Sequence, residues 1–155
     1  MLYVPRHFFV NIHTAIEAVL GREKFAGLLY EAGYKSAHHW CSHEAATHGL
    51  TGLAVFEHYL KRSSQRGWGK FSFENVDAGV GSADIRLEYS TFVLASPGNR
   101  GRLCYMFAGS FAGAMDWVME QGVRPVKTVS SETQCGAEGH SHCLFCVRPR
   151  SAPLR

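Results

Sequence analysis

The sequence lacks a strong net charge and any long hydrophobic run. Its sixteen Lys and Arg residues exceed the thirteen Asp and Glu residues by three, and no basic stripe with interleaved aromatic residues occurs, which argues against nucleic-acid binding. No apolar segment approaches the roughly 20 residues that a membrane span needs. The first ten residues contain neither a basic leader nor a small-residue cleavage site. We therefore expect a soluble cytoplasmic protein with neither a nucleic-acid partner nor a membrane partner.

The motifs that mark catalytic chemistry are also missing from the sequence. It contains no GxGxxG after an expected strand, no P-loop, no HExxH, and no flavin or nicotinamide signature. No Ser–His–Asp or Cys–His arrangement has a spacing that suits a nucleophile and its base. Catalysis is therefore not expected, and the chain has no helix-turn-helix with which to act on a promoter directly.

The composition is that of a folded domain. Hydrophobic residues make up 46% of the 155 residues and charged residues 19%, which is typical of a globular chain long enough to bury a core. We expect a single domain over residues 1–149. The Arg-containing segment 150–155 should be a flexible tail.

Hydrophobic periodicity predicts an α+β fold. Apolar residues recur at helical spacing over residues 11–20, 22–47, from about 51 to 67, and from Cys104 to Gln121. A period of two predicts strands around residues 71–73, 85–89, 123–131 and 143–148. The expected order is ααα–ββ–α–ββ, which suits an antiparallel sheet of about four strands packed by helices.

Cysteine is the residue whose distribution is most informative. Three of the five cysteines, Cys135, Cys143 and Cys146, lie within twelve residues, and in a cytoplasmic chain such clustering indicates metal or redox chemistry. Glu132 precedes Cys135 by three residues, and zinc takes thiolate, imidazole and carboxylate ligands. We expect a zinc site that contains Glu132, Cys135 and Cys143.

The fourth ligand stays open on local grounds. Cys146, His140 and His142 are near enough along the chain. In a regular strand over 143–148, however, Cys146 points away from the face that Cys143 and Phe145 share. A bend at this point would allow Cys143 and Cys146 to bind one metal ion together.

The pattern Glu132-x₂-Cys135-x₇-Cys143-x-Phe145-x-Val147, preceded by Cys104-x₄-Gly109-x₃-Gly113, resembles the 4-vinyl-reductase domain family. That family includes the sensor domains of phenol-responsive bacterial regulators and a bacteriochlorophyll-biosynthesis protein. The resemblance covers residues 104–148. It implies a structural zinc ion with Cys104, at the start of a helix, as the fourth ligand. It also implies a fold shared with vesicle-tethering subunits and related to haem nitric-oxide sensors.

Two helices carry further patterns. All residues from Ala108 to Ala114 except Phe111 are small. They indicate either close packing within the chain or a homodimer contact, and the resembled family is commonly dimeric. His39 and His43 share a face of the expected second helix, which suits a second metal site. No Asp or Glu shares that face as a clear third ligand, however, so structural or pocket-lining histidines are the expected role and a second metal site is the alternative.

A ligand pocket is expected between the helices and the sheet, lined by aromatic side chains with a few polar groups. Core packing is the alternative role for each of these residues. The residues expected to line it are Trp40, Phe56, His58, Tyr59, Phe107 and Phe111.

Three functions follow from these features. The first is a zinc-stabilised, non-catalytic domain that binds a small aromatic or cyclic molecule and acts through a protein partner. The second is an accessory or assembly subunit of a larger oxidoreductase complex, for example one acting on methylated amines, which rests on resemblance alone. The third is the reductase activity in the family's name, which no residue pattern in the sequence supports.

Overall fold

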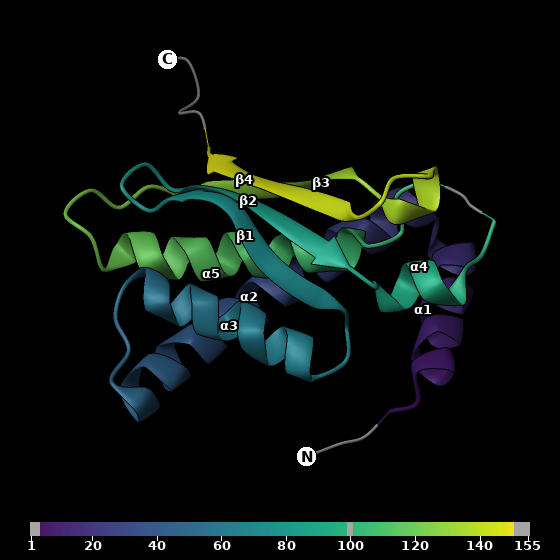
Figure 1. The fold of residues 1–155 in the computed structure, drawn as a ribbon, viewed down its shortest axis with the longest axis horizontal. Helices are drawn as coiled ribbons and strands as arrows, with labels where there is room; N and C mark the ends of the chain where they lie inside the picture. Colours follow the sequence, from purple (N-terminus) through teal and green to yellow (C-terminus); the bar gives the residue numbers. More distant parts are fainter. Residues whose placement is uncertain (1–3, 99–100, 151–155) are drawn as a thin grey trace.

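The computed structural model describes residues 4–98 and 101–150, and these form one sheet with helices on one face (Figure 1). Every helix in this part of the chain is too short or too polar to cross a membrane. Of the expected tail, residues 151–155 lie outside the described residues. The elements in chain order are α1 (Arg6–Leu20), α2 (Arg22–His48), α3 (Leu53–Gln65), β1 (Lys70–Asp77), β2 (Ser82–Glu88), α4 (Thr91–Ala95), the short 3₁₀ helix η1 (Tyr105–Phe107), α5 (Ala108–Glu120), β3 (Thr128–Gln134), the 3₁₀ helix η2 (Gly136–Glu138) and β4 (Cys143–Pro149).

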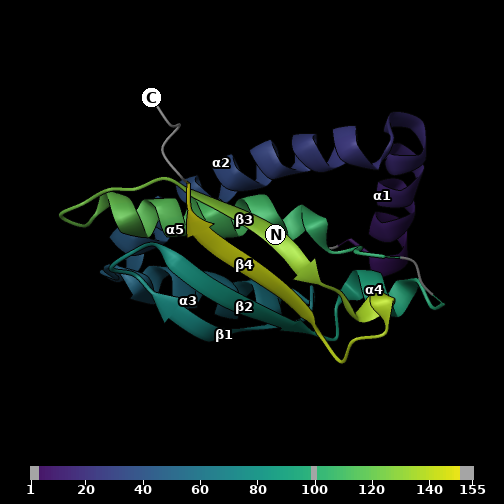
Figure 2. The ribbon, with the colours of Figure 1, turned by 90° about the horizontal axis from the view of Figure 1, so that it is seen from above.

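The four strands form an antiparallel sheet in the order β1–β2–β4–β3, visible from above in Figure 2. Ile85 at the centre of β2 pairs with Phe73 on β1 and with Phe145 on β4. Phe145 in turn pairs with Glu132 on β3. This register places the carboxylate of Glu132 at the end of an otherwise apolar row that faces the helices.

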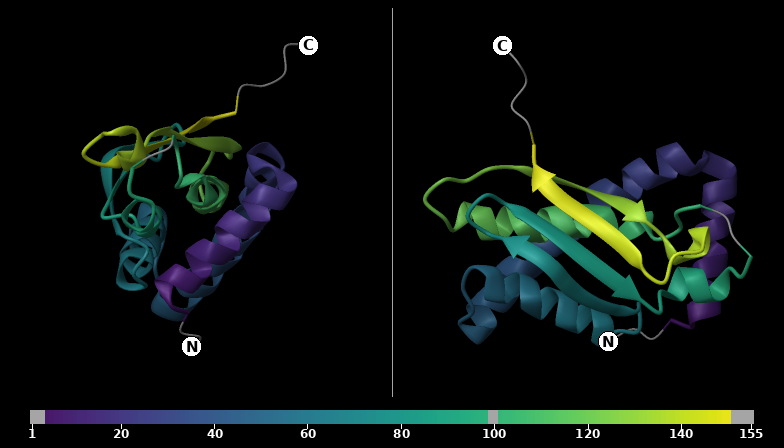
Figure 3. Two further views of the ribbon diagram at one scale, coloured as in Figure 1. Left: turned by 90° about the vertical axis from the view of Figure 1, so that its right-hand side faces the viewer. Right: turned by 45° about the horizontal axis from the view of Figure 1, so that its top comes forward.

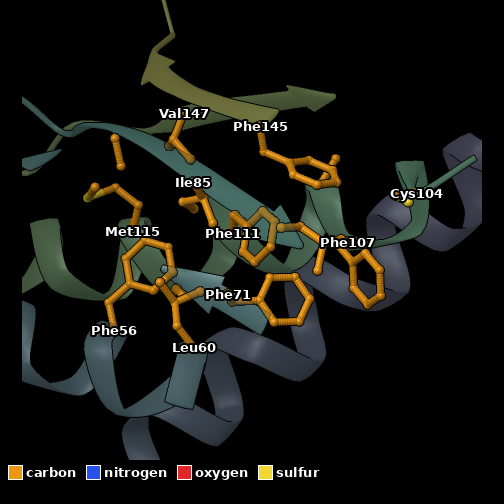
Figure 4. Packing of buried hydrophobic residues seen from close by; sticks show 14 of the residues in the cluster. Phe56, Leu60, Phe71, Ile85, Cys104, Phe107, Phe111, Met115, Phe145 and Val147 are labelled. Carbon is orange, nitrogen blue, oxygen red and sulfur yellow. The ribbon is translucent and has the colours of Figure 1, made fainter. Parts of the chain in front are cut away.

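The core lies between the sheet and helices α5 and α3. Phe111 on α5 is 1% exposed, and its ring lies 5.0 Å from that of Phe145 and 5.8 Å from that of Phe71 (Figure 4). Phe56 on α3 is fully buried and closes the other side of the core. Each such side chain contributes roughly 1.5–3 kcal/mol by leaving water, so this cluster is the main source of stability.

Helix α5 packs unusually closely against α2, because glycine occupies the contact. A Cβ atom added at Gly109 would lie 2.0 Å from the carbonyl oxygen of Tyr30, and one at Gly113 would lie 2.3 Å from that of Tyr34. The small-residue face of α5 is therefore filled by a helix of the same chain. Of the two roles considered for this face, close packing within the chain is the one that the structure shows.

A buried acid joins α5 to its neighbours. Asp116, 1% exposed, accepts hydrogen bonds from the backbone N–H and the hydroxyl of Thr128, each at 2.7 Å. The hydroxyl of Tyr34 on α2 donates to the other carboxylate oxygen, also at 2.7 Å. One side chain thus holds α2, α5 and β3 together, which fixes the edge strand that carries Glu132.

Helix α1 stands apart from this layer. It meets α2 at a corner formed by Gly21, whose φ of 80° is in the glycine-favoured region, and it continues past the sheet edge (Figures 2 and 3). On its inner face, the ring of Phe9 packs against Phe92 of α4 and Trp68. Its outer face exposes a row of apolar side chains.

The predicted α+β class and four-stranded antiparallel sheet are confirmed, with four differences in detail. The first helix begins at Arg6 rather than at residue 11, and the helix expected from Cys104 begins as η1 and becomes α-helical at Ala108. Helix α4, five residues long, was not predicted, because it is too short to show helical periodicity. The third strand begins at Thr128 instead of Val123, since Val123 lies fully exposed in the connection after α5.

Candidate metal centre

The four potential metal ligands of the candidate centre come from β3, β4 and the loops that flank η1 and η2. Cys104 precedes η1, at the end of the loop that leads into α5. Glu132 points inward from β3, Cys135 follows that strand directly, and Cys143 is the first residue of β4. The segment between Cys135 and Cys143 includes η2 and folds back on itself, so that the two thiols meet.

The four side chains converge in a buried space. Their ligand atoms all lie within 4.8 Å of one another, and the residues are between 0% and 5% exposed. The sulfur of Cys143 lies 3.6 Å from that of Cys104 and 3.6 Å from that of Cys135. Sulfur atoms at the corners of a tetrahedron around zinc, with bonds of ~2.3 Å, would be about 3.8 Å apart. The thiol spacing therefore fits a tetrahedral metal site.

Glu132 gives a second indication that a cation belongs here. Its Oε2 accepts a hydrogen bond of 3.0 Å from the backbone N–H of Cys104. Its Oε1 is buried and has no hydrogen-bond partner within the described residues. Buried polar atoms without a partner are rare, and a metal ion among the four donors would satisfy this oxygen.

The donors affect one another's proton affinity strongly. Burial, followed by the charge of Cys135, raises the pKa of Glu132 to about 9. Hydrogen bonds from Cys104 and Cys143 hold the pKa of Cys135 far below its usual range, while hydrogen bonds to Cys135 and Cys143 raise the pKa of Cys104. Without a cation the cluster can carry little negative charge. The buried Cys/Glu cluster can hold a metal ion, which would supply the missing positive charge.

Hydrogen bonds from the surrounding chain orient the sulfur atoms. The backbone N–H of Leu103 points to the sulfur of Cys135 at 3.5 Å, and that of Gly136 points to the sulfur of Cys143 at 3.3 Å. Ser90, which caps α4 by accepting from the N–H of Phe92, has its hydroxyl 3.0 Å from the sulfur of Cys104. Hydrogen bonds of this kind to the ligating atoms stabilise thiolates and fix the direction in which each sulfur points. Ser90 was not predicted, because a lone serine 14 residues before a cysteine gives no sequence signal.

The local alternatives for the fourth ligand lie elsewhere. Cys146 faces the opposite side of β4, where its sulfur is 3.5 Å from the hydroxyl of Thr133. His142 lies 3.4 Å from Glu74, and His140 is exposed. The structure thus brings Cys104 to the other three donors and places these three residues outside the cluster.

The six expected pocket residues separate into two groups. Phe56, Phe107 and Phe111 are buried in the core cluster. Trp40, His58 and Tyr59 instead meet between α2 and α3, where Trp40 stacks on His58 with ring centroids 5.5 Å apart and meets the edge of Tyr59 at 5.2 Å. The two histidines considered for a second metal site, His39 and His43, do not pair, since His39 is exposed and His43 lies 3.5 Å from Glu44.

A hollow of about 230 Å³ lies between α1, α4 and Leu103, the residue that precedes Cys104 in the chain. Its apolar walls include Val10, Phe92 and Leu103, and its polar groups include Glu17 and Arg22, which form an ion pair at 3.1 Å. Its other notable polar group is His13, 7% exposed, whose ring packs among those of Phe25, Phe92 and Tyr105. Within the core, Phe107 contacts Phe92 at 5.9 Å.

Comparison with known proteins gives a partial match to a family of unknown function and a clear fold. A family described as a domain of unknown function (DUF5943) matches residues 1–74, a match that ends before the four residues of the candidate metal centre. No curated protein sequence matches this chain.

Three solved structures are similar over nearly the whole chain. The phenol-responsive sensory domain of the transcription activator PoxR, solved with phenol, has a TM-score of 0.79 at 18% identity, over 96% of this chain and 76% of that one. Subunit 3 of a trafficking protein particle complex from Naegleria fowleri, covalently bound to palmitic acid, has a TM-score of 0.64 at 14% identity, over 94% and 95%. A vinyl-4-reductase family protein from Methanocaldococcus jannaschii has a TM-score of 0.63 at 17% identity, over 97% and 85%. The chain therefore has the fold of the phenol-responsive sensory domain, the vinyl-4-reductase family protein and the trafficking protein particle complex subunit, as its sequence resemblance predicted.

Proposed function

We propose that this chain is a non-catalytic domain that binds a small aromatic or cyclic molecule and is stabilised by a structural zinc ion. The observation that carries the proposal is that neighbouring residues serve the Cys104–Glu132–Cys135–Cys143 cluster and the hollow. Cys104 directly follows Leu103, which lines the hollow. The hydroxyl of Ser90 lies at hydrogen-bond distance from the sulfur of Cys104, and Phe92, two residues after Ser90, also lines the hollow.

Zinc is the metal that best suits this donor set. Three thiolates select a soft or borderline cation, and a buried tetrahedral site of sulfur and carboxylate ligands is typical of structural zinc. Four protein ligands leave no position for a substrate or a reactive water, so the site would support the fold rather than Lewis-acid chemistry.

The chemistry of the hollow supports an aromatic or cyclic ligand that carries one polar group. Val10, Phe92 and Leu103 would cover its apolar part, while His13 or Glu17 would exchange a hydrogen bond with its polar atom. The PoxR domain of the same fold was solved with phenol, which has this character. Of the six residues first expected to line the pocket, Phe107 would form the layer behind Phe92.

The test uses the zinc-loaded protein and a panel of phenols, cresols and cyclic amines, with thermal stability and calorimetric titration as readouts. We expect at least one compound to raise the melting temperature and bind at one molecule per chain. Val10→Phe should fill the hollow and abolish binding, whereas the exposed control Val129→Phe, on β3, should bind normally. Binding that is unchanged in Val10→Phe would place the ligand elsewhere, and a panel without any binder would contradict the proposal.

The alternative function, an accessory subunit of a larger oxidoreductase, is favoured by a different observation. The outer face of α1 exposes Phe8, Ile12, Ile16 and Val19, a surface suited to contact with another protein. Native mass spectrometry of the protein purified from its own host separates the two functions. One zinc ion with a bound organic mass would support the sensor-type domain, and a larger protein at fixed stoichiometry without an organic mass would support the accessory subunit.

A further inference from the structure

A second group of metal-binding side chains lies at the opposite end of α2, outside the site described above. Glu44 and His48 lie one turn apart near the end of α2, and His58 faces them from α3. The Nε2 atom of His58 lies 3.0 Å from Oε2 of Glu44, and Nε2 of His48 lies 3.2 Å from the same oxygen. We propose that Glu44, His48 and His58 form a second, exchangeable site for a divalent transition-metal ion.

The distances suit a shared metal ion. Bonds of 2.0–2.1 Å from nitrogen and oxygen to zinc place neighbouring ligand atoms about 2.9–3.4 Å apart, depending on whether the angle is octahedral or tetrahedral. Both measured separations fall within this range. Both imidazoles also present the same nitrogen, Nε2, to Oε2 of Glu44. A single metal ion can therefore take the place of the hydrogen bonds between the two nitrogen atoms and this oxygen.

The site is held in position before any ion binds. Gly49, with a φ of 62°, ends α2 and lets the chain return as α3, which brings His58 back over Glu44. The ring of His58 stacks on Trp40 at 5.5 Å with an angle of 20° between the planes, and this contact limits its rotation. Preorganised ligands lose less entropy when a metal ion binds.

The burial of the three residues indicates an open coordination shell. Glu44 is 16% exposed, His58 24% and His48 50%. Three protein ligands at the surface leave at least one position for water or for a ligand from outside, unlike the closed cysteine cluster. Two imidazoles and one carboxylate suit Zn²⁺, Ni²⁺, Co²⁺, Cu²⁺ or Fe²⁺ rather than Mg²⁺ or Ca²⁺.

A role in stability alone would not require both histidines. The Glu44–His58 contact already joins α2 to α3, and an exposed partner such as His48 contributes little to stability as an ion pair. The convergence of two imidazoles on one carboxylate oxygen is therefore better explained by the binding of a cation.

The experiment uses the full chain, freed of any affinity tag and loaded with one zinc ion at the cysteine site. Calorimetric titration with Ni²⁺ should show one further ion per chain, accompanied by quenching of tryptophan fluorescence, because Trp40 lies against His58. His48→Ala should weaken this binding at least about tenfold, and the pair His48→Ala with His58→Gln should abolish it. Zinc content and melting temperature should stay unchanged in His48→Ala, which removes only an exposed side chain.

His39→Ala is the matched control, because His39 is an exposed histidine on the same helix. It should bind Ni²⁺ as the unaltered protein does. The proposal is overturned if the zinc-loaded protein binds no further Ni²⁺, if His48→Ala binds it with unchanged affinity, or if His39→Ala loses it instead.

Discussion

At the scale of single residues, the direction of one side chain separates the members of the cysteine cluster. Cys143 and Cys146 are three positions apart on β4 and therefore point to opposite faces of the sheet. The sulfur of Cys143 joins the buried cluster, whereas that of Cys146 lies near Thr133 on the outer face. Chemical type alone does not distinguish these two thiols, but strand geometry does.

Replacement of a cluster thiol should remove the metal ion. Cys135→Ser or Cys104→Ser should lose the zinc and lower the free energy of unfolding by more than about 4 kcal/mol, because metal binding and folding are coupled. Cys146→Ser, on the outer face, is the matched control and should keep both metal and stability. Elemental analysis and urea unfolding measure these effects. If Cys146→Ser lost the zinc and Cys104→Ser retained it, the assignment of the fourth ligand would be wrong.

His13 should make stability depend on pH. Burial lowers the pKa of His13 below its usual value of 6.5, although the charge of Glu17 opposes part of this effect. The unfolded chain therefore binds the proton more tightly than the folded chain, so this contribution to stability is complete above pH 6.5 and falls as the pH decreases below it.

The comparison is between the zinc-loaded protein and His13→Phe, whose ring fits among the surrounding aromatic residues. We expect the unaltered protein to lose more unfolding free energy than His13→Phe between pH 7 and pH 5, measured by urea unfolding. Titration of the cysteine cluster is common to both proteins and cancels in the difference. Parallel pH profiles would show that His13 is not held neutral in solution.

At the scale of elements, the contact between α2 and α5 determines where the edge strand and the metal ligands lie. The contact depends on the absence of a side chain at Gly109 and Gly113, where α5 lies against the backbone of α2. Glycine disfavours a helix by about 1 kcal/mol relative to alanine, and here the close packing offsets that cost. The sequence showed the row of small residues, but not which helix covers them.

Gly109→Ala should therefore be destabilising although alanine is the better helix former. Its Cβ would lie 2.0 Å from the Tyr30 carbonyl oxygen, so the helices must separate, at a cost of roughly 1–3 kcal/mol or more. Gly27→Ala is the matched control on α2, because a Cβ there meets nothing within 4 Å; it should stabilise by about 0.4–1 kcal/mol. Urea unfolding midpoints that moved in the same direction for both variants would contradict the close approach of α2 and α5.

At the scale of the whole molecule, α1 is the element that its own chain leaves least covered. Phe8, Ile12, Ile16 and Val19 recur every three or four residues along its outer face and are between 38% and 84% exposed. A helix with such a stripe can pair with its own copy about a two-fold axis, which places the same apolar residues on both sides.

In the purified protein, without the larger partner of the alternative function, we therefore expect a homodimer that forms through α1. The pair of changes Ile12→Glu and Ile16→Glu should convert it to a monomer, because each adds a charge to the buried seam, while the zinc content stays unchanged. Val80→Glu, an exposed valine between β1 and β2, should remain dimeric. Light scattering after size-exclusion chromatography gives the mass. A monomer for the unaltered protein at micromolar concentration would contradict this expectation.

The sequence by itself determined the features that depend on neighbours along the chain. The period of the apolar residues predicted the three long N-terminal helices and the strands, since each pattern requires only local backbone geometry. The order of these elements along the chain then indicated an antiparallel sheet. It also grouped Glu132, Cys135 and Cys143, which are close in the chain, and separated Cys146 by strand alternation. Cys104, 28 residues from Glu132, could be proposed as a partner only from resemblance to a known family.

The tertiary structure decided what depends on the angles and distances between elements. It brought Cys104 and Ser90 to the other thiols, sent three of the six expected pocket residues into the core, and placed His58 over Glu44 instead of pairing His39 with His43. These contacts join residues whose separation is set by how α2, α3 and α5 pack, and that packing is a property of the whole core. A local pattern does not contain it, because the same helix can lie at many angles until every buried side chain has found its neighbours.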